Sequence, residues 1–275
     1  MKTRVISAII AIALLIIVLV FSSTVVLPIA LALLGLIAVY EIFNVSKATN
    51  NIILLVSSAL YVIATPVITY ISGSMTHLNV LALFIYLMLF AVSMLMYFNK
   101  INITRSFFSV VLVIMFAFSM SACVELINKE KYAYYFVIAA ICAWITDTAA
   151  LFVGKYFGSK KLAPVLSPNK TVEGAIGGVV FCVLISVLYS LFYTLFLSTD
   201  VSKVPNFVSI IFIPLAASVM GIIGDLFFSA IKRFFKIKDY GNIMPGHGGV
   251  LDRFDSFIFT SSFIAIIVRY IPLIG

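Results

Sequence analysis

The sequence predicts an all-α integral membrane protein with about nine transmembrane helices, a cytoplasmic N-terminus and a C-terminus outside. Of the 275 residues, 64% are apolar and only 10% are charged, and the mean hydropathy is +1.23. Soluble domains carry about 45–50% apolar and about 25% charged residues. The chain therefore has too few polar side chains to cover a water-soluble globule, which excludes the soluble fold classes.

Nine apolar runs account for the predicted helices. A helix needs about 20 apolar residues to cross roughly 30 Å of hydrocarbon. The runs are Val5–Phe21, Val25–Phe43, Ile52–Ile71, Leu78–Phe98, Phe107–Ile127, Tyr132–Val153, Val172–Leu197, Phe207–Ile231 and Phe257–Ile274. The first run is longer than the apolar core of about 7–15 residues in a cleaved signal peptide. We therefore expect it to be retained as a span.

The basic residues set the predicted orientation. With the N-terminus inside and the runs alternating in direction, 14 of the 18 Lys and Arg residues fall on the inner side and 4 on the outer side. Cytoplasmic loops of membrane proteins carry such an excess. We expect a multi-pass protein of the inner (cytoplasmic) membrane. Nucleic acid is not an expected partner, because the basic residues are spread along the chain.

The chain changes character near residue 130. Residues 1–130 contain five spans that are mostly hydrocarbon, and we expect them to form an N-terminal transmembrane region. Residues 131–275 are predicted to form a catalytic transmembrane region, with two long cytoplasmic loops at 154–171 and 232–256. These loops carry most of the polar chemistry.

Two acidic residues fall well inside apolar runs. Asp147 and Asp225 each lie about six residues from the inner end of a run. A carboxylate in a span costs at least about 2.5–3.5 kcal/mol, so each should face a polar cavity or a partner. An interhelical hydrogen bond or ion pair is the alternative to a functional role. Glu41 and Glu125 lie near span ends and could extend to the membrane interface, with a functional role as the alternative for each.

The predicted topology gathers charged residues on the inner side. The acids there are Asp147, Glu173, Asp225, Asp239, Asp252 and Asp255. The basic residues in the same segments are Lys155, Lys160, Lys161, Lys170, Lys232, Arg233, Lys236, Lys238 and Arg253. Carboxylates suit a hard cation such as Mg²⁺, and Lys and Arg suit phosphate groups. The pattern predicts a site for a metal–polyphosphate substrate at the cytoplasmic surface.

Two segments offer backbone N–H groups to an anion. The run Pro245-Gly-His-Gly-Gly249 lets the backbone approach an anion closely. Within it, His247 either donates to a phosphate oxygen or caps the turn. The segment from Ser167 to Glu173 is expected to begin a helix, whose N-terminus favours an anion, with Lys170 adding positive charge.

These residues resemble the signature of the CDP-diacylglycerol synthase family, also called phosphatidate cytidylyltransferases. The match begins at Ser229 and reads S-x-x-K-R-x4-K-D, then P-G-H-G-G-x-x-D-R-x-D as far as Asp255. A second stretch, from Asp147 to Gly174, is similar to another family segment. Residues 140–258 carry the resemblance, and the first hundred residues match only as apolar spans.

The resemblance implies the reaction of CTP with phosphatidate to give CDP-diacylglycerol and pyrophosphate. It also implies dependence on Mg²⁺, K⁺ as a candidate for a second cation position, and a homodimer. We assign Asp225, Asp252 and Asp255 as metal-binding and catalytic acids, with Lys232 as a further catalytic residue. The expected substrate-binding residues are Asp147, Lys170, Glu173, Ser229, Arg233, Lys238, Asp239, His247, Gly248, Gly249 and Arg253.

Three questions stay open at this level. An ion-coupled transporter could use buried Asp147 and Asp225 as a cation path, although the polar residues gather on one side of the membrane only. Another membrane CTP-dependent enzyme could act on a polyprenyl or archaeal-type lipid. The pair Gly174 and Gly178 could pack helices between subunits or within one subunit.

Overall fold

The computed structural model describes residues 13, 16–22, 24–129, 133–198, 205–243 and 248–274. Seven helical stretches in this part of the chain are long and apolar enough to cross a membrane. They are Val26–Ser46, Ile52–Ser72, His77–Met96, Ile103–Lys129, Tyr134–Phe157, Val172–Leu197 and Phe207–Phe234. The all-helical membrane class is therefore confirmed. The first predicted run lies mostly outside the described residues, and the ninth coincides only over residues 257–267 with a helix of 17 residues, Leu251–Ile267. Nine spans and the orientation of the termini stay predictions.

The chain divides into two compact units. The first unit comprises Met1–Asn128 and Phe235–Arg253, and the second comprises Lys129–Phe234 and Phe254–Gly275. The boundary after Asn128 lies close to the change in character seen in the sequence. The segment Phe235–Arg253, however, belongs with the N-terminal helices.

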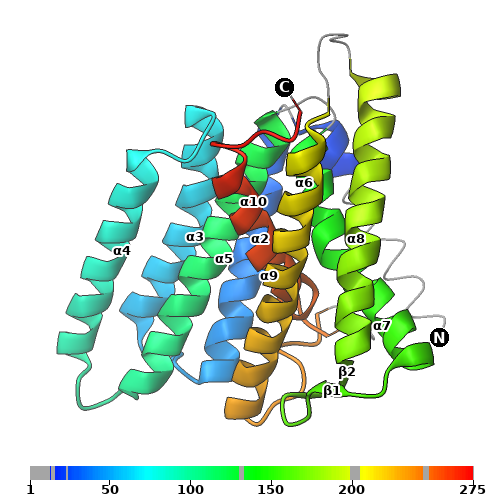
Figure 1. Ribbon diagram of the computed structural model, residues 1–275. Coiled ribbons are helices and arrows are strands. Elements are labelled where there is room, and N and C mark those ends of the chain that lie inside the picture. Colours follow the sequence, from blue (N-terminus) through cyan, green and yellow to red (C-terminus); the bar gives the residue numbers. More distant parts are fainter. Residues whose placement is uncertain are drawn as a thin grey trace. The chain divides into compact units, whose positions relative to one another are not determined.

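The first unit contains four long helices, α2 (Val26–Ser46), α3 (Ile52–Ser72), α4 (His77–Met96) and α5 (Ile103–Lys129), which lie side by side (Figure 1). Polar contacts tie them together. The hydroxyl groups of Ser58 and Tyr86 lie 2.9 Å apart, and Ser109 Oγ donates to Ser46 Oγ over 2.8 Å. The last contact places the beginning of α5 beside the end of α2.

The second unit is built around a helix that changes its winding. Helix α6 (Tyr134–Ala140) passes through a π-helical turn, η2 (Ile141–Ile145), into α7 (Thr146–Phe157). The hairpin of β1 (Lys161–Ala163) and β2 (Ser167–Thr171) leads to α8 (Val172–Phe192), which ends in a second π-helical turn, η3 (Tyr193–Leu197). Helix α9 (Phe207–Phe234) and most of α10 (Leu251–Ile267) complete the unit.

The glycines of α8 pack against α7 within the chain. A Cβ atom at Gly174 would lie 2.6 Å from the carbonyl oxygen of Ala150, and one at Gly178 would lie 2.7 Å from that of Thr146. Only glycine permits this approach of the two backbones. The small-residue pair whose role the sequence left open therefore serves packing inside one subunit.

Both long loops are shorter than the sequence predicted. Helix α7 continues through Phe157, α9 continues through Phe234, and α10 already begins at Leu251. Charged residues at these ends suggested loops, but basic side chains favour a helix C-terminus and acidic ones an N-terminus. Lys232 and Arg233 lie in the last turn of α9, and Asp252 lies in the first turn of α10.

The expected helix start at Ser167 is also corrected. Residues Ser167–Thr171 form strand β2, which pairs antiparallel with β1. Helix α8 begins at Val172, where Thr171 Oγ1 accepts a hydrogen bond from Gly174 N over 3.1 Å. Glu173 lies in the first turn, as predicted.

Candidate active site

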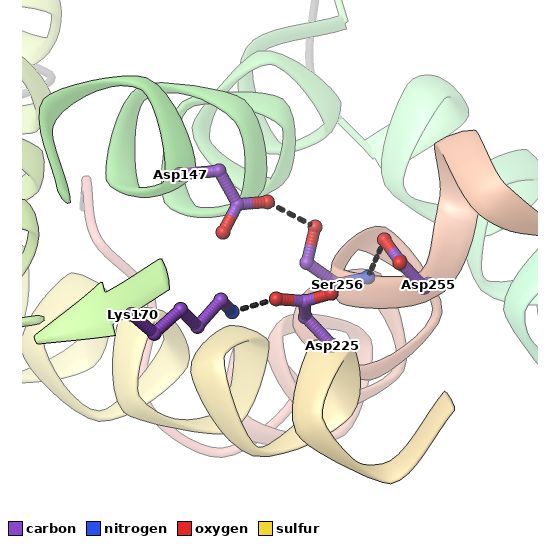
Figure 2. Close-up of polar contacts among 5 residues, drawn as sticks. All are labelled: Asp147, Lys170, Asp225, Asp255 and Ser256. Atoms are coloured by element: carbon purple, nitrogen blue, oxygen red, sulfur yellow. Dashed lines mark hydrogen bonds and ion pairs between the residues drawn. The ribbon is translucent and has the colours of Figure 1, made fainter. Parts of the chain in front are cut away.

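Four segments of the second unit bring together five polar residues, which we call the Asp/Lys cluster (Figure 2). Asp147 comes from α7, Lys170 from β2, Asp225 from α9, and Asp255 and Ser256 from α10. The ammonium group of Lys170 forms an ion pair with the carboxylate of Asp225. Ser256 Oγ donates to Asp147 Oδ2 over 2.8 Å, and Ser256 N donates to Asp255 Oδ1 over 2.8 Å. All but Ser256 were predicted as site residues.

The two aspartates within the apolar runs both have partners. Asp147 accepts from a hydroxyl on α10, and Asp225 pairs with a lysine from the hairpin. The predicted need of each buried carboxylate for a partner is thus met inside the chain. These contacts are the hydrogen bond and the ion pair that the sequence left open as the alternative to a functional role, and the functional role of both aspartates stays a prediction.

A change in helix winding precedes Asp147. The π-helical turn η2 ends at Ile145, and Thr146 Oγ1 donates to the carbonyl oxygen of Cys142 over 2.7 Å. Such single π turns often occur at functional sites, since the wider turn alters the direction of the side chains that follow. Sequence periodicity does not reveal this turn.

Lys170 is positioned by the hairpin and by the beginning of α8. Val172 N donates to the carbonyl oxygen of Lys160 over 2.9 Å. The carboxylate of Glu173 accepts from the N–H groups of Ser159 and Lys160, at 3.0 and 3.1 Å. Glu173 therefore fastens the hairpin to α8; its predicted contact with substrate stays a prediction.

The cluster has an excess of negative charge. With all three of its carboxylates ionised, the cluster carries three negative charges against the one positive charge of Lys170. The positive charge of Lys232 also interacts electrostatically with Lys170. The side chains of Lys170 and Asp225 are 25% and 19% exposed. Burial lowers the pKa of Lys170, and Lys232 lowers it further, while the carboxylates of Asp147 and Asp255 oppose this shift. A further cation is favoured here on electrostatic grounds.

The end of α9 adds basic groups to the second unit. Ser229 follows Asp225 by four residues, and Lys232 and Arg233 follow Ser229 by three and four, so these side chains share one side of the helix. Arg233 Nε donates to the carbonyl oxygen of Leu166 over 3.4 Å. Arg233, a predicted phosphate-binding residue, therefore connects the end of α9 to the hairpin.

The remaining predicted residues lie in the first unit, in the α9–α10 loop (residues 235–250) and at the start of α10. Asp252 Oδ2 accepts from Tyr240 N over 2.7 Å and from Gly249 N over 3.1 Å. Gly248 adopts a left-handed conformation with φ of 86°. Lys238, Asp239 and Arg253 are exposed. His247, with residues 244–246, lies outside the described residues.

The predicted metal-binding acids fall into both units. Asp225 and Asp255 belong to the Asp/Lys cluster, whereas Asp252 belongs to the first unit. No three Asp, Glu, His or Cys side chains within the described residues are grouped as a ready-made metal site. Mg²⁺ usually takes one or two carboxylates together with waters and substrate phosphates. The donor set of the cluster fits a cation of this kind, arriving with its phosphate ligand.

Glu41 is the residue whose role the sequence did not indicate. We expected its side chain to extend to the membrane interface, but it is 1% exposed. Its carboxylate accepts from the N–H groups of Val250 and Leu251 over 2.8 and 3.0 Å. Glu125, expected to behave similarly, is 5% exposed and accepts from Met75 N over 3.0 Å. Both expectations were wrong, because backbone N–H groups inside the protein supply the partners.

Comparison with known proteins finds one matching family model and several similar proteins that are named phosphatidate cytidylyltransferase. Residues 2–271 match the model of the "Cytidylyltransferase family". A phosphatidate cytidylyltransferase of Bacillus subtilis (strain 168) is 41% identical over 143 residues, which are 51% of this chain and 50% of the relative. Those of Staphylococcus haemolyticus (strain JCSC1435) and Staphylococcus aureus (strain COL) are 40% and 39% identical over 126 and 132 residues. These matches cover 46% and 48% of this chain, and 45% and 48% of the relatives.

The matched region spans about half the length of these curated relatives. The family model, in contrast, covers nearly the whole chain, from the N-terminal helices to the end of α10. The chain therefore belongs to the cytidylyltransferase family.

Proposed function

We propose that the protein is a membrane phosphatidate cytidylyltransferase that converts CTP and phosphatidate to CDP-diacylglycerol and pyrophosphate, for phospholipid biosynthesis. Three similar proteins named phosphatidate cytidylyltransferase support this proposal. The observation that carries it is the Asp/Lys cluster, where one ammonium group lies among three carboxylates. Such an arrangement suits a phosphate group and a hard cation that arrive together.

The reaction needs no activated side-chain nucleophile. A phosphate oxygen of phosphatidate attacks the α-phosphorus of CTP, the new P–O bond forms, and the bond to the β-phosphate breaks to release pyrophosphate. A phosphate monoester is largely ionised at neutral pH, because its second pKa is about 6. The protein has to align two anions and stabilise the charge on the leaving group.

The basic residues of the second unit perform the alignment. Lys170 exchanges its contact with Asp225 for a phosphate oxygen, while Lys232 and Arg233 bind further phosphate oxygens at the end of α9. Asp225, no longer paired with Lys170, would then hold a cation together with Asp255. Asp147 keeps Ser256 in place beside this site.

Mg²⁺ is the proposed cation, and Asp225 and Asp255 would hold it together with substrate phosphate. Asp252, which belongs to the first unit, stays a predicted metal-binding acid. When bound, Mg²⁺ neutralises the charge that develops on pyrophosphate. K⁺ is a candidate for a second cation position, and the resemblance to the family motivates a homodimer.

The membrane arrangement follows from the same reasoning. We propose nine spans in the inner (cytoplasmic) membrane, with the N-terminus inside, the C-terminus outside and the active site facing the cytoplasm. A lipid acceptor can then meet a water-soluble nucleotide at the interface.

Substrate competition tests the proposal. Purified protein should transfer a label at the α-phosphorus of CTP into chloroform-soluble product only when phosphatidate is present. ATP should be a poor donor, and diacylglycerol, which lacks the phosphate, a poor acceptor. Equal use of ATP and CTP, or equal use of diacylglycerol and phosphatidate, would remove the basis for this function.

A further inference from the structure

Helix α10 begins without an oxygen-bearing side chain directly before it. The first N–H groups of a helix have no partner within the helix and are usually capped by a nearby Ser, Thr, Asp or Asn. The residues directly before α10 are Gly248, Gly249 and Val250. None of them can provide such a cap.

Glu41 of α2 supplies the cap from about two hundred residues away. Its Oε1 accepts from Val250 N over 2.8 Å, and its Oε2 accepts from Leu251 N over 3.0 Å. A carboxylate at this point also interacts favourably with the helix dipole. The neighbouring Gly249 N donates to Asp252 Oδ2. Three successive N–H groups at the start of α10 are therefore bound by two carboxylates.

The glycines of the α9–α10 loop make room for the Glu41 carboxylate. A Cβ atom at Gly241 would lie 2.6 Å from Glu41 Oε1, and one at Gly249 would lie 2.5 Å from it. Either methyl group would displace the carboxylate or the loop. Glu41 thus binds the end of the loop through Val250 and Leu251, and its carboxylate lies beside Gly241 in the middle of the loop.

We propose that Glu41 is a positioning residue for cytidylyl transfer: from α2 it holds the α9–α10 loop and the first turn of α10, and thereby orients Asp252. This inference rests on the proposed function and extends it to a helix outside the signature segments. Glu41 does not contact the substrate. Its carboxylate binds the N–H groups of Val250 and Leu251, and Asp252 Oδ2 accepts from the adjacent Gly249 N, so the effect passes along this short stretch of backbone.

The test compares two buried glutamates of the first unit. Glu41→Gln keeps the shape of the side chain but replaces one acceptor oxygen with an NH₂ group facing a backbone N–H. Glu125→Gln is the matched control, because Glu125 also accepts from a loop N–H, that of Met75. Glu125 lies sixteen residues beyond Ser109, or about 24 Å along α5, and Ser109 contacts the end of α2 that carries Glu41.

Four quantities are measured for each purified variant: kcat, the KM for CTP, the Mg²⁺ concentration that gives half-maximal rate, and the thermal midpoint in detergent. Removing a partner that orients a metal ligand typically lowers activity or metal affinity about 10–100-fold. We expect Glu41→Gln to lose kcat/KM by such a factor and to need more Mg²⁺. Glu125→Gln should lower the thermal midpoint without either change.

Gly241→Ala provides a second variant that leaves Glu41 and Asp252 intact. It should reproduce the loss of Glu41→Gln, and the double variant should lose little more, because both changes disturb the same contact. Parental kcat/KM and Mg²⁺ requirement in Glu41→Gln would overturn the proposal, as would equal losses in Glu125→Gln. Failure of both Glu41→Gln and Gly241→Ala to fold would also overturn it, by assigning Glu41 to folding. Absence of CTP transfer by the parent protein would contradict the proposed function instead.

Discussion

The ion pair between Lys170 and Asp225 joins the stability of the second unit to its proposed chemistry. If the Asp225 carboxylate had no partner in its span, Asp225→Asn would relieve an insertion cost and would not unfold the protein. The structure instead gives Asp225 a partner on β2. The substitution therefore removes the ion-pair partner of a largely buried ammonium group, which keeps Asp147 and Asp255 as neighbouring anions.

The burial of the pair determines the expected magnitude. Exposed ion pairs contribute about 0–1 kcal/mol, whereas loss of one partner from a fully buried pair costs about 3–5 kcal/mol. The two side chains are 25% and 19% exposed, and Lys170 keeps two other carboxylates nearby. We expect Asp225→Asn to lower the free energy of unfolding by about 1–3 kcal/mol, between these limits.

Activity should fall much further than stability. Removing a carboxylate that holds the charge-neutralising cation should cost on the order of 10²-fold or more in kcat. A double-variant cycle with Lys170→Gln separates the loss of the ion pair, which affects stability, from the loss of the cation-binding carboxylate, which affects kcat. Stability should be partly recovered in the double variant, with a coupling free energy of about 1–3 kcal/mol, while activity should not recover.

Unfolding in mixed detergent micelles and labelled CTP incorporation at limiting Mg²⁺ measure these quantities. The protein should elute as a single species in every variant. A coupling free energy near zero, together with near-parental turnover in Asp225→Asn, would refute both the pairing and the assignment of Asp225 to the cation site.

Three further predictions concern the pH profile, the helix packing and the topology. Because burial lowers the pKa of Lys170, kcat/KM should decline at a lower alkaline pH than an exposed lysine would give. Lys170→Arg, whose guanidinium stays charged, should move this decline to higher pH, and an unmoved profile would exclude Lys170 as its source. Gly178→Ala places a methyl group against the Thr146 carbonyl and should cost about 1–3 kcal/mol of unfolding free energy; an unchanged thermal midpoint would contradict the packing of α7 on α8. Reporters fused after Ser159 and Asn242 should give a cytoplasmic signal and one after Lys203 an external signal, whereas an external signal from either of the first two would overturn the orientation.

The apolar runs predicted the helices well because length and hydropathy are sufficient to identify a membrane span. Seven runs correspond to helices of spanning length in the described residues. The helix ends were predicted less well, as Lys232, Arg233 and Asp252 show. These charged residues stabilise helix termini through the dipole, so the change from apolar to charged does not mark the end of a helix.

The Asp/Lys cluster was predictable in composition but not in pairing. Residue types and topology indicated that Asp147, Lys170, Asp225 and Asp255 would lie on one side of the membrane. The pairing of Lys170 with Asp225 depends on the β1–β2 hairpin. Strand β2 has only five residues without strong apolar alternation, so the sequence did not indicate a strand there. The role of Glu41 depends on a contact across more than two hundred residues, and no local pattern encodes it.

The position of the transferred phosphorus provides the most direct test of the proposed reaction. Two parallel reactions with purified protein, phosphatidate and Mg²⁺ would use CTP labelled at the α-phosphorus or at the γ-phosphorus. Cytidylyl transfer predicts that the α-label enters the chloroform-soluble lipid and that the γ-label leaves as pyrophosphate. Lipid carrying the γ-label, or no phosphatidate-dependent lipid carrying the α-label, would contradict the assignment.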